Sequence, residues 1–380
     1  MKNIQQKRIA IVGGGPGGLT LARLLQLKGA DVKVYERDFD KNVRVQGATL
    51  DLHEESGLKA LEAAGLMDAF MSNYRPGADH TRITNHKAHI LLDDEAKEPG
   101  ELGRPEIDRG PLRKMLIDSL REDTIVWDSH FIAMSKEGDA WKLEFKNGTS
   151  AVADLVIAAD GANSKIRPLI TPLKPFYAGI TVVEGGVING AVEAPNINKL
   201  LNGGKIFAFG DEKSLIVSSK GDGSLAFYVG FKQEENWFRD NGIDFTNKEE
   251  VVAWFKQTFT NWDKIWFELF ENAYSFTIRP QYCMPLDQTS VAHSNLTMLG
   301  DAAHLMPPYA GEGVNMAMLD ALELSICLTD DLFNELSVAI AHYEKHMNIR
   351  FAEIGQITLE QTEMLHSPQA IANMMQVMGK

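Results

Sequence analysis

Three segments of the sequence combine residue types and spacings that suit the binding of a nucleotide. The first is a glycine-rich run in which Gly13, Gly15 and Gly18 form the pattern G-x-G-x-x-G, with Pro16 inside it. Glycines at this spacing permit a tight turn, a close approach of the backbone to a pyrophosphate and close helix–strand packing. Glu36 ends the next strand pattern, where its carboxylate is able to accept hydrogen bonds from a ribose. The run therefore predicts a dinucleotide site, with a purely structural turn as the alternative.

The second segment has the pattern D-G-x-x-S-x-x-R, formed by Asp160, Gly161, Ser164 and Arg167 after an apolar strand pattern. A carboxylate at the end of a strand is able to cap the next turn and to fix the approach of a dinucleotide. A plain strand-to-helix turn, capped by Asp160 and Ser164, is the alternative for this segment.

The third segment follows another apolar strand pattern. Asp301 stands at the strand end, where its carboxylate suits a polyol hydroxyl, and Gly311 and Gly313 leave backbone N–H groups uncovered at the start of a helix. Such a helix start suits an anion, including the electron-rich edge of a reduced flavin. His304 is a candidate base, but a histidine satisfied by structural contacts is the preferred interpretation. The residues of this segment that we expect at the nucleotide are Asp301, Pro308, Gly311, Gly313, Val314 and Asn315.

The elements that position these residues begin with a strand, a helix and a strand over residues 7–12, 19–27 and 31–36. A βαβ unit of this length indicates a parallel sheet. Strand patterns separated by glycines dominate residues 172–277, where one aromatic-rich helix is expected over 254–270, more as core packing than as a ligand wall. The predicted fold class is α/β: a Rossmann-like domain with a parallel sheet, an inserted, mostly antiparallel β domain and a C-terminal helix. We assign residues 1–171 and 278–330 to the nucleotide-binding domain, 172–277 to the substrate-binding β domain, and 331–380 to a helical segment bridging the two.

The composition limits the classes of partner. The 380 residues are 44% hydrophobic and 24% charged, with a net charge of −14, which argues against nucleic acid as the main partner. Cys283 and Cys327 lie outside any C-x-x-C or Cys/His cluster, so neither a disulfide nor a metal site is expected. The sequence has no apolar run of 18 residues, so we expect a cytoplasmic protein without a membrane span.

In this order, with a β-rich stretch between the second and the third, the three segments resemble the single-component FAD-dependent aromatic hydroxylases, typified by para-hydroxybenzoate hydroxylase. The resemblance covers about residues 7–347. It implies that the nucleotide is FAD, that NADPH or NADH reduces it, and that O₂ supplies an oxygen atom inserted into a small aromatic molecule. It also implies that the cofactor carries the chemistry, so no side chain is assigned as a catalytic nucleophile.

A narrower resemblance is to the tetracycline-inactivating monooxygenases of the TetX type. The stretches that carry it are 34–38, 47–53, 105–109, 112–113 and 300–315. This resemblance implies that Glu36 and Arg37 hold the adenosine and that Arg44 and Asp51 contact flavin or nicotinamide, although Arg44 and Asp51 are also explicable as surface charge. It further implies that Arg109 reaches the ribityl chain or the pyrophosphate and that Asp301 binds the flavin.

The substrate face departs from that group. At positions where the tetracycline enzymes carry glutamine, arginine and histidine, this chain has Glu184, Lys205 and Ala226. Replacing arginine by lysine removes the planar fork of donors, and alanine removes a donor entirely. The expected substrate contacts are Glu184, Lys205, Phe207, Ile216, Ala226, Pro308 and Gly311.

Hydroxylation of a polycyclic aromatic molecule, with a tetracycline as the first candidate, is the function that the sequence favours. Another phenolic or polyketide-like substrate is an alternative. A flavin dehydrogenase that inserts no oxygen is a second, and a nicotinamide-binding sensor without turnover is a third, although it leaves the second and third segments unexplained. We expect a monomer.

Overall fold

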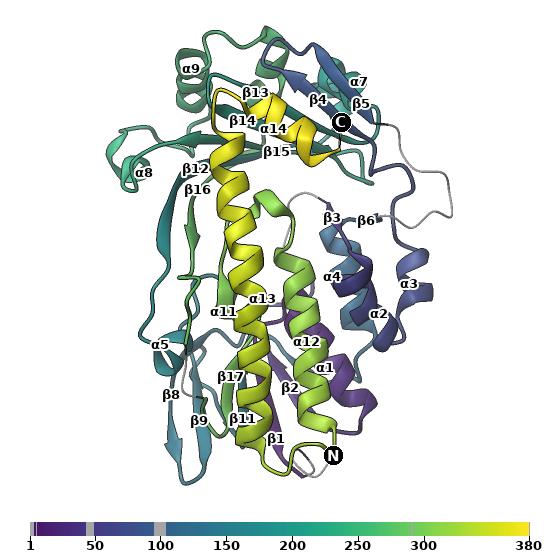
Figure 1. Ribbon diagram of the computed structural model, residues 1–380, viewed down its shortest axis with the longest axis vertical. Coiled ribbons are helices and arrows are strands. Elements are labelled where there is room, and N and C mark those ends of the chain that lie inside the picture. The colour runs from purple at the N-terminus through teal and green to yellow at the C-terminus, as the bar shows by residue number, and fades with distance from the viewer. Residues whose placement is uncertain (1–3, 5, 43–48, 95–103, 290–291, 380) are drawn as a thin grey trace.

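The computed structural model describes residues 4, 6–42, 49–94, 104–289 and 292–379 (Figure 1). Figure 1 shows two layers of sheet at opposite ends of the long axis, joined by long helices that run between them. The α/β class predicted from the sequence is confirmed, with one wholly parallel sheet and one that is mostly antiparallel.

The lower sheet positions all three nucleotide-binding segments. Its five parallel strands are, in spatial order, β17 (Leu296–Met298), β11 (Leu155–Ala158), β1 (Arg8–Val12), β2 (Asp31–Tyr35) and β7 (Ile125–Val126). The helices α1 (Pro16–Leu27) and α12 (Gly313–Thr329) pack against each other beside it. Because parallel strands end at the same edge, the turns that follow β1, β11 and β17 lie side by side.

The upper sheet has seven strands. In spatial order they are β16 (Ser275–Cys283), β12 (Phe176–Val187), β15 (Leu225–Lys232), β14 (Lys213–Ser219), β13 (Lys205–Gly210), β4 (Thr81–Asn85) and β5 (Ile90–Asp94). All neighbours are antiparallel except β13 and β4. The sheet therefore takes in residues 81–94 and extends to 283, beyond the range 172–277 assigned from the sequence. Within residues 81–94, β5 is an edge strand in which no residue is fully buried, so it lacks the apolar alternation that marks a buried strand.

The aromatic-rich stretch of residues 254–270 is three elements, so the single helix expected there is wrong. The helix α9 (Lys248–Thr258) ends before the 3₁₀ turn η2 (Lys264–Trp266), which is followed by α10 (Phe267–Glu271). The break is local, because the Asp263 carboxylate accepts a hydrogen bond from Ile265 N at 3.0 Å and starts a new turn. Its aromatic side chains form the core between these helices and one face of the upper sheet, as the packing interpretation predicted.

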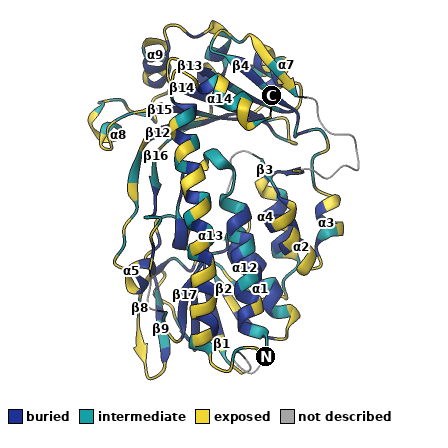
Figure 2. Cartoon of the chain, in the orientation of Figure 1, coloured by how far each residue is buried: buried dark blue, intermediate teal, exposed yellow. Residues whose placement is uncertain are grey.

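The helix α13 (Leu336–Leu365) runs along both sheets, and α14 (Ala370–Val377) lies beside the upper one (Figure 1). Figure 2 shows the outward face of α13 exposed and the strands behind it buried. A fully buried carboxylate, that of Asp320 on α12, ties this arrangement together. It accepts hydrogen bonds from Arg350 of α13 at 2.7 Å and from Gly300 N at 2.9 Å, and pairs with His304 Nε2 at 2.6 Å.

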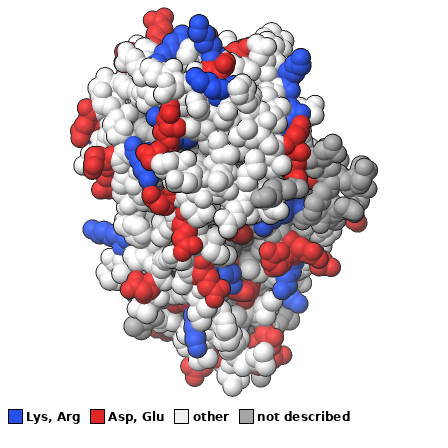
Figure 3. Space-filling view, turned by 45° about the horizontal axis from the view of Figure 1, so that its top comes forward, with Lys and Arg blue, Asp and Glu red and all other residues white. Residues whose placement is uncertain are grey.

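Smaller elements complete the chain. The strands among them are β3 (Leu50–Asp51), which pairs with β6 (Glu106–Ile107), and the small sheet of β8 (Phe131–Glu137), β9 (Ala140–Phe145) and β10 (Ser150–Ala153). The helical elements are the π turn η1 (Glu54–Leu58), the 3₁₀ turn η3 (Pro308–Ala310), α2 (Lys59–Ala63), α3 (Met67–Met71), α4 (Arg109–Asp118), α5 (Arg167–Ile170), α6 (Gly190–Glu193), α7 (Pro195–Leu201), α8 (Trp237–Asp240) and α11 (Asp301–His304). Among the described residues, no helix has the length and apolar character needed to cross a membrane. On the face in Figure 3, acidic and basic side chains are interspersed with neutral surface.

Phe255 is the centre of the aromatic core, and its removal should destabilise the fold. Its ring is fully buried and stacks on Phe270 at 3.7 Å and Phe259 at 4.4 Å between centroids. We expect Phe255→Ala to lower the free energy of unfolding by about 3–5 kcal/mol, measured by urea denaturation, because truncation leaves a cavity. The exposed Phe39 provides the control, and Phe39→Ala should change the same quantity by less than about 0.5 kcal/mol.

Candidate active site

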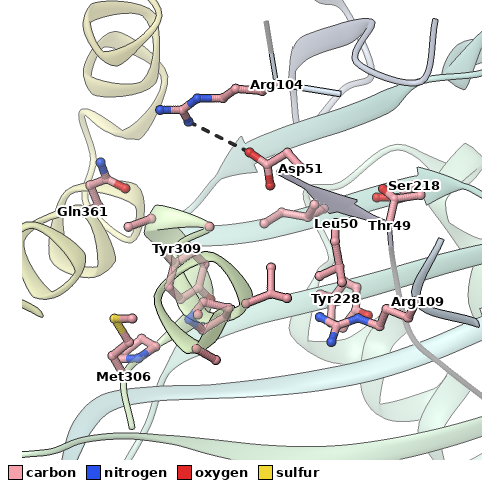
Figure 4. A pocket seen from close by; sticks show the side chains of 18 of the residues that line it. Thr49, Leu50, Asp51, Arg104, Arg109, Ser218, Tyr228, Met306, Tyr309 and Gln361 are labelled. Atoms are coloured by element: carbon pink, nitrogen blue, oxygen red, sulfur yellow. Dashed lines mark ion pairs between the residues drawn. The ribbon is translucent and has the colours of Figure 1, made fainter. Parts of the chain in front are cut away.

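One cavity of about 740 Å³ joins the two sheets. At one end it is lined by the turn after β1 and by Asp301, and at the other by Phe207, Ile216 and Tyr228 on the upper sheet. Figure 4 shows labelled side chains of this cavity, with Asp51 and Tyr309 among them. The residues expected at the nucleotide and those expected at a substrate therefore share one continuous space.

The glycine-rich run forms a cradle whose backbone is open to the cavity. A Cβ on Gly18 would overlap Gly13 O, and Gly13 has a φ of +114° and lies against Ala159 O, so both positions require glycine. Gly15 is different, because a Cβ there meets nothing within 4 Å, and no side chain caps the helix α1 at this residue. Gly15 and Pro16 both line the cavity. The backbone N–H groups at the start of α1 have no side-chain cap, and such a helix start suits a pyrophosphate.

Glu36 supports this turn from behind. Its carboxylate is buried and accepts hydrogen bonds from Gly14 N at 2.6 Å and from Asp38 N at 2.9 Å. Arg37, the next residue, is exposed. Neither of them lines the cavity, and Arg44 lies outside the described residues.

The second and third segments are joined by one side chain. The Arg167 guanidinium donates hydrogen bonds to three carbonyls: Ala302 O at 2.6 Å, Asp301 O at 2.7 Å and Ala162 O at 3.0 Å. Asp160 accepts from Lys165 N at 2.8 Å, and Ser164 Oγ accepts from Arg167 N at 3.0 Å, as the capping interpretation requires. The other oxygen of Asp160 is buried and has no hydrogen-bond partner among the described residues. The segment is thus a capped turn with one unpaired carboxylate oxygen, and its residues Ala159 and Gly161, on either side of Asp160, line the cavity.

Asp301 faces the cavity, and Arg109 at the start of α4 lines the same region (Figure 4). The surrounding protein raises the pKa of Asp301 by desolvation, although His304, Arg109 and Arg167 act in the opposite direction. His304 does not face the cavity, because its ring pairs with Asp320 and stacks on Phe351 at 5.5 Å. The interpretation of His304 as a structural histidine agrees with these contacts.

The start of α12 contributes a second open helix end. The 3₁₀ turn η3 (Pro308–Ala310) leads into Gly311, which has a φ of +72°, and a Cβ on Gly313 would meet nothing within 4 Å. Pro308, Gly311, Gly313 and Val314 all line the cavity. Asn315 is fully buried instead, and its amide donates to Asp51 O at 2.9 Å and accepts from His53 N at 3.0 Å. Asn315 therefore holds the strand β3 against α12.

A charged cluster at this junction was missed in the sequence. His53 is buried between two carboxylates, with Nε2 at 3.1 Å from Asp51 Oδ2 and Nδ1 at 3.3 Å from Glu312 Oε1. Burial disfavours the charged ring, but the contacts with Asp51 and Glu312 outweigh it and raise the pKa of His53 to about 9. Arg104 lies 3.9 Å from Asp51 (Figure 4). The spacing of Asp51 and His53, two residues apart in a strand pattern, was the available local signal.

The upper end of the cavity has a polar edge and an apolar wall. Lys205 forms an ion pair with the buried Glu106, and both line the cavity. Burial raises the pKa of Glu106 despite the neighbouring ammonium group. Phe207 and Ile216, expected at the substrate, line the cavity, as do three methionines near the C-terminus: Met364, Met374 and Met378.

Two of the expected substrate residues lie outside the cavity lining. Glu184 forms an ion pair with Arg279 on the neighbouring strand β16, and Ala226 is buried on β15. Their contact with a substrate stays a prediction.

The charge on His53 makes a prediction for stability against pH. Because the folded-state pKa is above the ordinary value of about 6.5, the stabilisation is complete below pH 6.5 and is lost as pH rises through 9. We expect the unfolding free energy of the wild type to exceed that of His53→Gln at pH 6, and the difference to shrink by pH 10. Urea denaturation at both values measures it, with the exposed-site variant His342→Gln as the control. A difference that is equal at both pH values would contradict a charged His53.

Comparison with known proteins agrees with this site. Residues 6–336 match the FAD binding domain family. The chain is 29% identical to monooxygenase asqM of Emericella nidulans over 84% of this chain and 83% of the relative. It is 26% identical to the 6-hydroxynicotinate 3-monooxygenase of Pseudomonas fluorescens, over 94% and 92% of the two chains.

Two solved structures share the fold. Klebsiella pneumoniae HpxO complexed with FAD and uric acid has a TM-score of 0.76 at 20% identity, with 99% of this chain and 92% of that chain covered. The tetracycline destructase Tet(51) has a TM-score of 0.70 at 18% identity, with 98% and 96% covered. With the open glycine cradle, the unpartnered oxygen of Asp160 and the match over most of its length, the chain belongs to the FAD binding domain family and is an FAD-dependent monooxygenase.

Proposed function

We propose that the FAD lies along the cavity from the start of α1 to the start of α12. Gly15 and Gly18 would hold the pyrophosphate through the N–H groups at the start of α1, and Pro16, which has no N–H, would contact it only by packing. Asp301 and Arg109 offer an acceptor and donors, respectively, to the hydroxyl groups of the ribityl chain.

The flavin ring would then meet Pro308, Gly311, Gly313 and Val314, where the N–H groups of α12 favour negative charge. Asp51 borders the same region. Glu36 acts by fixing the turn at Gly14, and the adenosine would extend toward Glu36 and Arg37, as the resemblance to the TetX-type monooxygenases implies.

The substrate that we propose is a small aromatic molecule. The observation that carries this proposal is the continuity of the cavity from the cofactor end to a wall of Phe207, Ile216 and Tyr228 on the upper sheet. Aromatic and thioether side chains accommodate a planar apolar body well. The names of two relatives, 6-hydroxynicotinate 3-monooxygenase and 3-amino-4-hydroxybenzoate 2-monooxygenase, contain single-ring aromatic acids.

A tetracycline is the finer candidate within this proposal. It is supported by the resemblance of the sequence to the TetX type and by the shared fold with Tet(51). The polar edge is of a different kind, however, because Lys205 is engaged by Glu106 and Glu184 by Arg279. Since buried hydrogen-bonding groups discriminate most strongly between ligands, another phenolic or polyketide-like compound is the alternative.

When bound, FAD supplies the hydride chemistry with NADPH or NADH and the activation of O₂. The residues of the chain do the rest. The start of α12 stabilises negative charge at the flavin edge. Met364, Met374 and Met378 exclude water from the substrate end, and the Lys205–Glu106 pair orients a polar group of the substrate. No side chain has to act as a nucleophile.

Hydroxylation is tested by NADPH consumption in aerated buffer by the FAD-loaded enzyme. We expect tetracycline or 6-hydroxynicotinate to accelerate NADPH oxidation several-fold and to yield a product that carries one oxygen atom from ¹⁸O₂, detected by mass spectrometry. Reaction with only one of the two distinguishes a polycyclic from a single-ring substrate. The substitution Phe207→Ser should raise the KM of the accepted compound, because it removes an aromatic ring from the wall.

If neither compound gave an oxygenated product, both would be excluded as substrates. If a broader panel of phenols also released only hydrogen peroxide, the proposal of an aromatic substrate would be wrong.

The cradle gives a separate prediction for cofactor binding. Because the Cβ of residue 15 points into open space, we expect Gly15→Val to leave the unfolding free energy of the apoprotein nearly unchanged while weakening FAD binding at least about tenfold through steric exclusion. Gly18→Ala, whose Cβ overlaps Gly13 O, should lower both the unfolding free energy and the affinity for FAD. Flavin fluorescence quenching measures the Kd, and unaltered FAD affinity in Gly15→Val would place the pyrophosphate elsewhere.

A further inference from the structure

The side chain of Tyr309 lies at the boundary between the cofactor end and the substrate end of the cavity. It belongs to the 3₁₀ turn η3, directly before the open start of α12, and it borders the cavity (Figure 4). Its ring packs edge-on against the ring of His366, with centroids 4.9 Å apart and an interplanar angle of 79°. The Tyr309 hydroxyl lies 3.3 Å from His366 Nε2. The turn at the flavin edge is thus in contact with the end of α13.

His366 is suited to accept that hydrogen bond. Its ring is fully buried, and Nδ1 lies 2.7 Å from Thr362 O. A carbonyl oxygen only accepts, so the proton of the neutral ring is on Nδ1 and Nε2 presents a lone pair. Burial also lowers the pKa of His366 to about 4. Two hydroxyls converge on this lone pair: Tyr309 Oη, and Ser214 Oγ of the strand β14 at 2.9 Å.

Room for this cluster is made by a glycine on the neighbouring strand. A Cβ on Gly230 of β15 would overlap the Tyr309 hydroxyl and would lie 2.6 Å from both His366 Nε2 and Ser214 Oγ. Gly230 is not among the residues with positive φ, so space rather than backbone conformation requires glycine there. Four separate elements, η3, α13, β14 and β15, therefore meet at one point.

We propose that Tyr309 is a positioning residue: its hydroxyl, held at His366 Nε2 beside Ser214, fixes the flavin-edge turn against the substrate sheet. This inference rests on the proposed placement of FAD along the cavity. Since the turn leads directly into α12, the anchor sets the distance between the N–H groups of α12 and the wall formed by β13 to β15.

The test compares two tyrosine variants in the FAD-loaded enzyme. Tyr309→Phe removes the anchoring hydroxyl and keeps the ring. Tyr343→Phe removes a buried hydroxyl, which donates to Met298 O at 3.0 Å on the lower sheet, and Tyr343 does not line the cavity. Hydrogen–deuterium exchange of residues 308–313 and the visible absorption and fluorescence of bound FAD are measured for both, together with the melting temperature.

We expect exchange of residues 308–313 to rise about threefold to tenfold in Tyr309→Phe, which is the effect of losing one hydrogen bond. The spectrum of bound FAD should change in the same variant. In Tyr343→Phe both should match the wild type, even though its melting temperature falls at least as much. Ser214→Ala, which leaves the Tyr309 contact in place, should have a smaller effect on exchange than Tyr309→Phe.

Exchange and flavin spectrum that are the same in Tyr309→Phe as in the wild type would overturn the proposal. Equal changes in Tyr309→Phe and Tyr343→Phe would also overturn it, because they would indicate general destabilisation. Neither readout needs a substrate. Failure of the aromatic substrates therefore leaves this test intact, and a negative result here leaves hydroxylation intact.

Discussion

The buried carboxylate of Asp320 is the interaction on which the arrangement of the site depends. Burial opposes its charge, but His304, Arg350 and the backbone N–H of Gly300 lower its pKa below the ordinary range. An ionised group in the interior is strongly destabilising unless it is paired and fully hydrogen-bonded. Asp320 meets that requirement only when α12, α13 and the turn after β17 are all in place, so its satisfaction fixes the position of Asp301 and of the bridging helix together.

The same rule applies to the charges at the cavity. His53 is charged because Asp51 and Glu312 flank it, and Lys205 faces Glu106. These pairs use side chains from β3, β6, β13 and the start of α12, so they join the lower half of the molecule to the upper sheet. Because these charges are paired, the apolar wall is the larger part of the surface that an aromatic ligand would contact.

Local patterns were sufficient to predict the parallel sheet, the glycine cradle and the open start of α12. Each of these depends on residues close together in the sequence, such as Gly13 and Gly18 or Gly311 and Gly313. The contacts of His53 with Glu312 and of Asn315 with Asp51 join residues about 260 positions apart, and no spacing rule indicates them. The ion pair of Glu184 with Arg279 shows the same limit, because Arg279 lies on a strand that is adjacent only in space.

The aromatic stretch of residues 254–270 was assigned one helix because helical periodicity continues across the break. The local signal for the break is the side chain of Asp263, which caps the start of a new turn. The strands β4 and β5 were left out of the upper sheet because β4 is mostly polar and β5 is a short edge strand, and only the pairing of β4 with β13 and of β5 with β4 gives them their place.

That pairing has a consequence for how the molecule is divided. The upper sheet is made from two separate stretches of chain, residues 81–94 and 176–283, and the parallel pair β13–β4 is the seam between them. If the later stretch were excised alone, β4 in the remaining chain would lose its neighbour. In the excised piece, β13 would have a bare strand edge. Recombination between relatives that exchanged only the later stretch would join mismatched halves of one sheet. The upper sheet is therefore complete only with the early part of the chain, and chimeras that respect the seam have to carry both pieces.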